Sequence, residues 1–235
     1  MRISRLSHCL KTFFLKWPRS TGLAGEGKGA ACSLALGQPN LYFSAMTKAQ
    51  RQRLINAILY FARETKFAGQ TKLLKLLYLL DFEHFEHTGR SVTGLDYDAW
   101  KLGPVPTTLR AEWKDGFKGD LAALVHLRTE ALQAHVRQTI IPNDGAEFDE
   151  SYFTPRQLGL MKEIASRYRE AYSQDMISIT HAKDGAWDKV WRDGAGQNDP
   201  IPYELALRDD CGDREEILRS AREYQAFADA LCAGR

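Results

Sequence analysis

The stretch TKLLKLLYLLDFEHFEHTG, residues 71–89, constrains the fold of this 235-residue chain more than any other segment. Thr71 is a residue type that caps helix N-termini, and Gly89 is of the type found just past helix C-termini. His87 lies in the expected last turn, where a positive charge is favoured. Apolar residues cover most of the circumference between these ends: Leu73, Leu74, Leu76, Leu77, Leu79, Leu80, Phe82 and Phe85. A helix that is apolar on nearly all sides is buried, so the sequence predicts a central helix with other elements packed around it.

Amphipathic segments predict the helices that surround this centre. Residues 48–65 carry apolar residues at helical spacing, and residues 107–113 are expected to form a short helix. In TPRQLGLMKEIASRYREAY, Thr154 and Gln157 have the spacing of a capping box, and Pro155 occupies the first helical position. These local signals define three helices before any tertiary contact is considered.

The chain after residue 142 adds two more helices and two irregular segments. We expect Ser173 to cap the helix QDMISITHA. Asp213 with Glu216 predicts the start of a final amphipathic helix that runs to about residue 231. Residues 143–153 (NDGAEFDESYF) are expected to form an acidic loop, and residues 198–207 (NDPIPYELAL) to be extended.

Two segments have the composition or the alternation of strands. Residues 95–101 (LDYDAWK) are rich in aromatic and aliphatic residues, and the Gly103, Pro104 and Pro106 that follow are expected to stop the strand in a stiff turn. Apolar and polar residues alternate in residues 132–140 (LQAHVRQTI), which is typical of a half-exposed strand. We expect these two strands to pair, whereas residues 121–128 are ambiguous. The predicted fold class is therefore α+β and mostly helical, a compact helical domain with a small antiparallel sheet.

The first 45 residues differ from the rest of the chain. They hold six Lys and Arg residues against one acid, and five glycines fall within residues 22–37. We expect residues 1–45 to be a disordered leader, or the product of a start codon assigned too early, with Met46 as the true start. Residues 46–207 are then expected to form one domain, with residues 208–235 as a helix that packs on it or extends it.

Charge and cysteine content exclude several classes of protein. Residues 46–235 carry 26 basic and 29 acidic residues, which argues against a nucleic-acid groove, because such grooves are clustered basic faces. No apolar run reaches the roughly 18 residues that a membrane span needs. The four cysteines, Cys9, Cys32, Cys211 and Cys232, form no C-x-x-C pair, so we expect no disulfide framework and a reducing cytoplasm.

Catalytic signals are weak. His84 and His87 lie three residues apart on the central helix, a spacing that can place two imidazoles on one metal ion, but no second ligand cluster completes the site. Asp96 and Asp98 share a strand face and are a candidate carboxylate pair, although solvated acids at a strand edge are common. The chain contains no G-x-S-x-G nucleophile motif and no phosphate-binding loop. We expect no catalytic residue, cofactor or metal, with a metal-dependent hydrolase using His84 and His87 as the alternative.

Three separated segments resemble one protein family. Residues 72–106, KLLKLLYLLDFEHFEHTGRSVTGLDYDAWKLGPVP, are similar to the signature of the Panacea domain, which runs K-L-x-K-L-x-Y-L-x-D, then T-G, then G-x-x-Y-x-A-x-x-x-G-P-V. SITHAKDGAWDKVW resembles the family's Thr-His followed by Trp, and IPYELAL resembles its closing segment. The resemblance covers about residues 46–207 and points to the SocA-like antitoxins, also described as phage-associated proteins.

The resemblance implies a small, mostly helical α+β domain that acts as the antitoxin of a bacterial toxin–antitoxin pair. Such an antitoxin neutralises a toxin encoded nearby by direct protein–protein contact. The alternative that the family implies is a protease adaptor that delivers the toxin to a ClpXP-type protease. Many members carry an extra DNA-binding segment, but neither residues 1–45 nor residues 208–235 read as a helix-turn-helix, so we expect no nucleic-acid partner. The family supplies no catalytic residues.

The stiff turn is the candidate contact surface for the toxin. Trp100 and Lys101 beside Pro104 and Val105 would form a rigid, partly apolar edge, and rigid aromatic anchors lose little entropy on docking. The alternative for Trp100 is inward packing under the first helix. His181 and Trp187 are further candidates for partner binding: alternatively, His181 ends a helix and Trp187 fills the core.

Overall fold

The computed structural model describes residues 46–114, 116–131, 136–209 and 212–233. These residues form eight α-helices and two antiparallel sheets of two strands each, which confirms the predicted mostly helical α+β fold. The predicted leader lies outside the described residues, as do Cys9, Cys32, Cys211 and the first four residues of the strand expected over 132–140. None of the described helices is long and apolar enough to cross a membrane.

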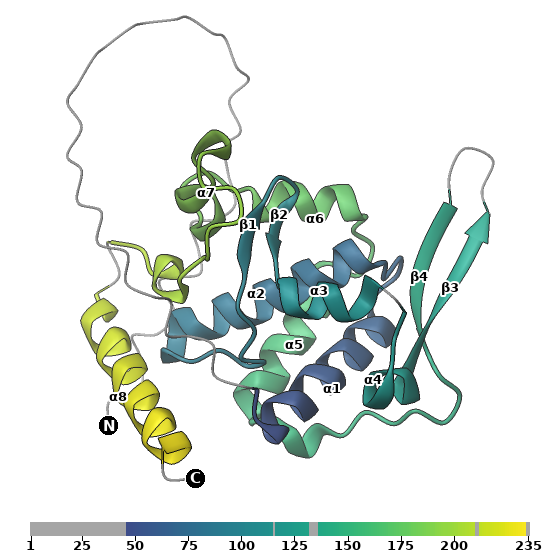
Figure 1. Ribbon diagram of the computed structural model, residues 1–235, viewed down its shortest axis with the longest axis horizontal. Coiled ribbons are helices and arrows are strands. Elements are labelled where there is room, and N and C mark those ends of the chain that lie inside the picture. Colours follow the sequence, from purple (N-terminus) through teal and green to yellow (C-terminus); the bar gives the residue numbers. More distant parts are fainter. Residues whose placement is uncertain (1–45, 115, 132–135, 210–211, 234–235) are drawn as a thin grey trace, which may run out of the picture. The chain divides into compact units, whose positions relative to one another are not determined.

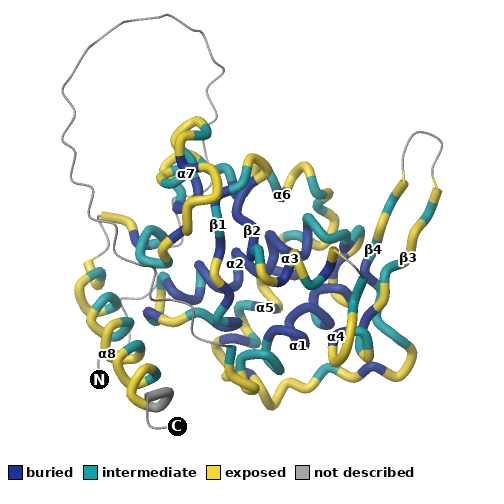
Figure 2. The backbone as a smooth tube through the Cα atoms, viewed as in Figure 1, coloured by how far each residue is buried: buried dark blue, intermediate teal, exposed yellow. Residues whose placement is uncertain are grey.

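Helix α2 (Gln70–Thr88) is the central element, as the sequence predicts (Figure 1). It contacts α1, α5, α6 and α8, and its apolar residues are buried on nearly all sides (Figure 2). The helix begins before the expected cap, Thr71, because the Gly69 carbonyl already accepts the Leu73 N–H at 3.0 Å. It ends as expected at Gly89, whose φ of 69° lies in the left-handed region.

The caps and apolar patterns of the sequence predicted most of the helices around α2 correctly. The capping box of Thr154 and Gln157 is present at the start of α5, and Asp213 precedes α8, where its carbonyl accepts the Ile217 N–H. Helix α6 begins at Ser173 itself, after Tyr172, because the Asp175 carboxylate accepts the Tyr172 N–H at 2.7 Å. The helices around α2 are α1 (Lys48–Glu64), α3 (Thr107–Lys114), α4 (Gly119–Leu124), α5 (Pro155–Arg167), α6 (Ser173–Thr180), α7 (Ala186–Trp191) and α8 (Arg214–Ala233).

The strands pair differently from the prediction. Strand β1 (Asp98–Trp100) pairs with β2 (Gly103–Val105), inside the segment that was expected to stop a strand. Pro104 is accommodated because its partner Ala99 directs its N–H and C=O to Asp199 and Asn198, so the missing proline donor leaves no ladder hydrogen bond unmade. The expected pairing of 95–101 with 132–140 is therefore wrong.

The second sheet is a hairpin of its own. Strand β3 (Val125–Ala131) pairs with β4 (Val136–Pro142) in a register that places Leu127 opposite Ile140. The ambiguous segment 121–128 thus holds the end of α4 and the start of β3. The Ile140 N–H donates to the Ala68 carbonyl at 2.9 Å, which fixes the hairpin against the α1–α2 loop.

Short 3-10 helices interrupt two segments that were expected to be irregular or extended. In the acidic loop, η1 (Glu150–Tyr152) is capped by Asp149. Residues 198–207 were predicted to be extended. The prediction is correct at Pro200, which forms an isolated β-bridge with Asp98, and wrong at the 3-10 helix η3 (Tyr203–Ala206). A further 3-10 turn, η2 (Arg192–Gly194), follows α7.

Helix α8 rests on the C-terminal end of α2. Gly89 permits this contact, since a Cβ added there would lie 2.5 Å from the Ile217 carbonyl oxygen of α8. The Arg90 guanidinium lies 4.7 Å from the centre of the Tyr224 ring, and the Ser220 hydroxyl donates to the Thr88 carbonyl. The glycine that ends α2 therefore also makes room for the last helix.

Candidate functional site

A buried lysine marks the site. Lys75 lies on α2 with only 2% of its surface exposed, and its Nζ donates to the Pro104 carbonyl of β2 at 2.7 Å. Among the described residues no carboxylate pairs with it, and burial lowers the pKa of its ammonium to about 7. The signal that could have revealed Lys75 is a charge on the core-facing side of an otherwise apolar helix.

The β1–β2 hairpin lies directly on this lysine. Gly103 has a φ of 96°, and a Cβ added there would lie 2.7 Å from Lys75 Nζ and 2.9 Å from Thr180 Oγ1. Only glycine both adopts this positive φ without strain and has no Cβ to collide with Lys75 and Thr180. The Gly-Pro-Val segment is thus pressed between α2 and the C-terminal end of α6.

Aromatic rings close the other side of the hairpin. His181 follows α6 and stacks on Trp187 of α7, with ring centres 3.7 Å apart, and Trp191 stacks on Trp187 at 5.4 Å. The Trp187 Nε1 donates to the Trp100 carbonyl at 3.0 Å. Burial, and secondly the charge of Lys75, lower the pKa of His181. We call Lys75, Gly103, Thr180, His181 and Trp187 the Lys75 site.

Two polar atoms near these rings are buried and have no hydrogen-bond partner within the described part of the chain: Trp100 Nε1 and His181 Nε2. Most buried donors and acceptors in folded proteins are satisfied, so a pair of this kind at one hairpin is unusual. The Lys75 site is therefore held by stacking and by backbone acceptors, while part of its hydrogen-bonding capacity is unused.

The hairpin presents three residues to solvent at its end, which we call the β1–β2 tip: Trp100, Lys101 and Leu102. Trp100 is half-buried, with the Arg110 guanidinium 4.6 Å from its ring centre, and Lys101 is exposed. Leu102 is 58% exposed, which is unusual for a leucine, and the sequence-based prediction missed it. The exposure of Leu102 could have been predicted from its place in the two-residue loop between the strands, where side chains point outward.

Burial corrects the predicted contact surface. Pro104 and Val105 are buried, because β2 packs against α2 and α6, with the Pro104 carbonyl on the Lys75 ammonium. Trp187 is 4% exposed and fills the core, which was the alternative considered for it. These three side chains are thus absent from the surface, and His181 is only partly exposed. Partner binding stays a prediction for all six candidates, and Trp100, Lys101 and His181 are the ones whose side chains reach the surface.

The predicted metal ligands have other surroundings. His84 is buried, with its Nδ1 2.6 Å from the Arg90 carbonyl oxygen, and His87 is exposed. The Asp98 carboxylate accepts the Thr107 hydroxyl at 2.7 Å, whereas Asp96 is exposed. Within the ranges that the structure describes, no three His, Cys, Asp or Glu side chains are grouped to hold a metal ion.

Two more polar residues of α2 have structural roles that the sequence did not indicate. Lys72 donates to the carbonyls of Lys66, Arg169 and Ala171 at 2.7–3.1 Å, which uses all three ammonium protons. Asp81 is fully buried and accepts the N–H groups of Val92 and Thr93 and the hydroxyls of Thr93 and Tyr97. Burial raises the pKa of Asp81, and these donors oppose the shift. Both residues fasten loops to the central helix.

Comparison with known proteins identifies one family. The model of the antitoxin SocA-like, Panacea domain matches residues 73–188. This range contains the whole Lys75 site and the β1–β2 tip. The search of curated proteins and the search of solved structures gave no match.

Proposed function

Because residues 73–188 carry an antitoxin SocA-like, Panacea domain, we propose that this protein is the antitoxin of a bacterial toxin–antitoxin pair and neutralises its toxin by direct protein–protein contact. The toxin would be a protein encoded nearby, and the complex would form in the cytoplasm. We propose a binding protein rather than an enzyme. Lys75 is the lysine of the site, and burial lowers its pKa, but its ammonium donates to a backbone carbonyl beneath the hairpin.

The observation that carries the proposal is an exposed apolar residue on a rigid support. Leu102 is 58% exposed, beside Lys101 and the half-buried Trp100. The backbone beneath them is held by Lys75 at the Pro104 carbonyl and by Trp187 at the Trp100 carbonyl. A surface that is already ordered loses little entropy when a partner docks, so more of the contact energy remains as affinity.

Substitutions at the β1–β2 tip test the proposal. Leu102→Asp combined with Lys101→Glu should abolish rescue of cells that express the toxin, and should weaken toxin binding by about tenfold or more. Thermal unfolding should stay unchanged, because both side chains are exposed. The matched control is Phe227→Asp on α8, which changes an apolar side chain of similar exposure, 62%. Full rescue by the tip variant would place the toxin contact elsewhere.

The fate of the bound toxin distinguishes neutralisation by occlusion from delivery to a protease. Occlusion predicts a stable complex and an unchanged toxin half-life when the antitoxin is co-expressed. An adaptor predicts a shorter toxin half-life in cells with a ClpXP-type protease, and no shortening in cells that lack it. A pulse-chase measurement in the two strains separates these outcomes.

A further inference from the structure

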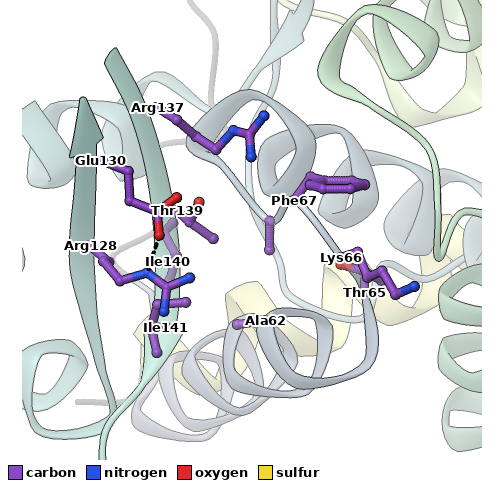
Figure 3. A pocket seen from close by; sticks show the side chains of 11 residues that line it. Ala62, Thr65, Lys66, Phe67, Arg128, Glu130, Arg137, Thr139, Ile140 and Ile141 are labelled. Carbon is purple, nitrogen blue, oxygen red and sulfur yellow. Dashed lines mark ion pairs between the residues drawn. The ribbon is translucent and has the colours of Figure 1, made fainter. Parts of the chain in front are cut away.

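A pocket of about 290 Å³ lies away from the Lys75 site, between the end of α1 and the β3–β4 hairpin (Figure 3). Its wall on one side is Ala62 of α1 and the loop from Thr65 to Ala68. The opposite wall is the hairpin, from which Arg128 and Arg137 extend toward the loop. The Ile140–Ala68 backbone hydrogen bond closes its base.

Positive charge dominates the lining of this pocket. Lys66, Arg128 and Arg137 line it against one carboxylate, Glu130. Arg128 pairs with Glu130 at 3.0 Å and Lys66 with Glu170 at 2.9 Å, but all four side chains are at least 40% exposed. Ion pairs as exposed as these contribute little and can exchange partners at small cost.

Arg137 differs from the other two cations. Its guanidinium lies 5.6 Å from the centre of the Phe67 ring, and within the described ranges it forms no ion pair, since its cross-strand neighbour Glu130 pairs with Arg128. The residue is half-buried, so its charge is less well hydrated than that of a fully exposed arginine. An arginine guanidinium can lie over an aromatic ring and can also bind a carboxylate through two parallel N–H···O hydrogen bonds.

Phe67, whose ring lies under Arg137, has a strained backbone conformation. Phe67 has a φ of 55°, in the left-handed region that bulky side chains avoid. Its carbonyl accepts the Gly69 N–H at 2.7 Å, and its ring stacks on Tyr172 with centres 4.5 Å apart. Strain of this kind recurs at ligand-binding sites, where the surrounding structure maintains it. The aromatic platform is therefore in place before any ligand arrives.

We propose that this pocket binds an acidic residue on an extended segment of the protein partner, with its carboxylate on Arg137 and its methylene groups against Phe67 and Ile141. The partner's identity as a toxin rests on the proposed function. The volume, at or below the roughly 300–1,000 Å³ usual for small-molecule sites, suits one residue rather than a large cofactor. The basic leader, with one acid in residues 1–45, does not have the charge to fill it.

The test uses the full-length protein and two synthetic hexapeptides, acetyl-(Glu)6-amide and acetyl-(Gln)6-amide, in calorimetric titrations at low salt. We expect the glutamate peptide to bind at least tenfold more tightly than the glutamine peptide. Arg137→Gln should reduce that binding about tenfold, and Arg137→Lys should restore only part of it. The control is Arg222→Gln, which removes an exposed arginine of α8 and should leave binding unchanged.

Three results would overturn the proposal: equal binding of the two peptides, wild-type binding by Arg137→Gln, or a self-associated protein that dissociates in Arg137→Gln and binds no peptide as a monomer. The last result would assign the pocket to a second copy of the chain. Failure of the proposed function is distinguishable, because it appears as absent toxin rescue while the peptide still binds. The β1–β2 tip variant should bind the glutamate peptide as the wild type does.

Discussion

Lys75 shows how one residue can join the core to the candidate contact surface. An isolated ammonium is costly to bury, and within the described part of the chain the Pro104 carbonyl is the one hydrogen-bond acceptor of Lys75. An apolar residue of similar length would fill the space, but it would leave the Pro104 carbonyl without this donor. Lys75 thus holds β2 on α2 through the Pro104 carbonyl, two residues from the β1–β2 tip.

The pKa of Lys75 predicts a pH-dependent stability. A folded pKa of about 7, below the ordinary 10.5, means that the unfolded chain binds more protons between these values, so this residue's contribution to stability rises with pH across that window. Lys75→Met removes the dependence. The free energy of unfolding of the variant minus that of the wild type should therefore fall by about 1–3 kcal/mol from pH 6 to pH 9.5.

Urea unfolding of both proteins at several pH values measures this difference. The comparison cancels the titrating groups that Lys75 does not influence, such as Tyr78, whose pKa is raised by burial; His181, whose pKa the Lys75 charge lowers, is not cancelled. A constant difference across the range would show that Lys75 keeps its ordinary pKa in the folded protein.

At the scale of elements, the β1–β2 hairpin is short but firmly held. Its six paired residues make few hydrogen bonds to each other, yet the hairpin contacts α2, α6 and α7. The segment around Pro200 lies along β1, where Pro200 forms an isolated bridge with Asp98 and the Ile201 N–H donates to the Tyr97 carbonyl. Isolated two-stranded hairpins are marginal in water, so packing on the helices is what keeps this one ordered.

Gly103→Ala tests how closely the hairpin must approach α2. The substitution forces a Cβ to within 2.7 Å of Lys75 Nζ at a φ of 96°, and should cost about 2 kcal/mol or more. Gly116→Ala is the matched control, because Gly116 has a φ of 84° but nothing within 4 Å of the added carbon. The difference between the two variants in the free energy of unfolding, measured with urea, gives the cost of the contact with Lys75. Equal losses would mean that backbone conformation alone accounts for the effect.

At the scale of the whole molecule, charge is distributed unevenly along the chain. Residues 46–235 carry a small acidic excess, and residues 1–45 a basic one. Within residues 46–235 the basic pocket at Arg137 is a local exception to the acidic excess. Two surfaces of different chemistry, the β1–β2 tip and this pocket, would allow a partner to be held at two points.

We predict that residues 1–45 contribute little to the stability of the rest. Their glycine content, their lack of helical periodicity and their opposite charge balance set them apart from the segments expected to form the core. A chain that begins at Met46 should melt within a few degrees of the full chain in a calorimetric scan, and should rescue toxin-expressing cells equally. Insolubility of the shorter chain, or a much lower melting temperature, would show that the segment packs on the domain.

The sequence by itself determined the long helices and several of their ends. The apolar circumference of α2, the capping box of Thr154 and Gln157 and the left-handed Gly89 are local features, set by residues within a few positions of one another. The segments that resemble the Panacea domain were likewise identified from the sequence alone, and they contain the residues of the Lys75 site.

Only the tertiary structure decided which strands pair, which motif side chains are buried and which charges meet. Pro104 can sit in a strand because Asn198 and Asp199 satisfy Ala99, a contact between positions about 100 residues apart. Arg137 reaches Phe67 only because the β3–β4 hairpin folds against the α1–α2 loop. Local propensity contains no information on such long-range contacts, since their free energy comes from surfaces that meet only when the chain is folded.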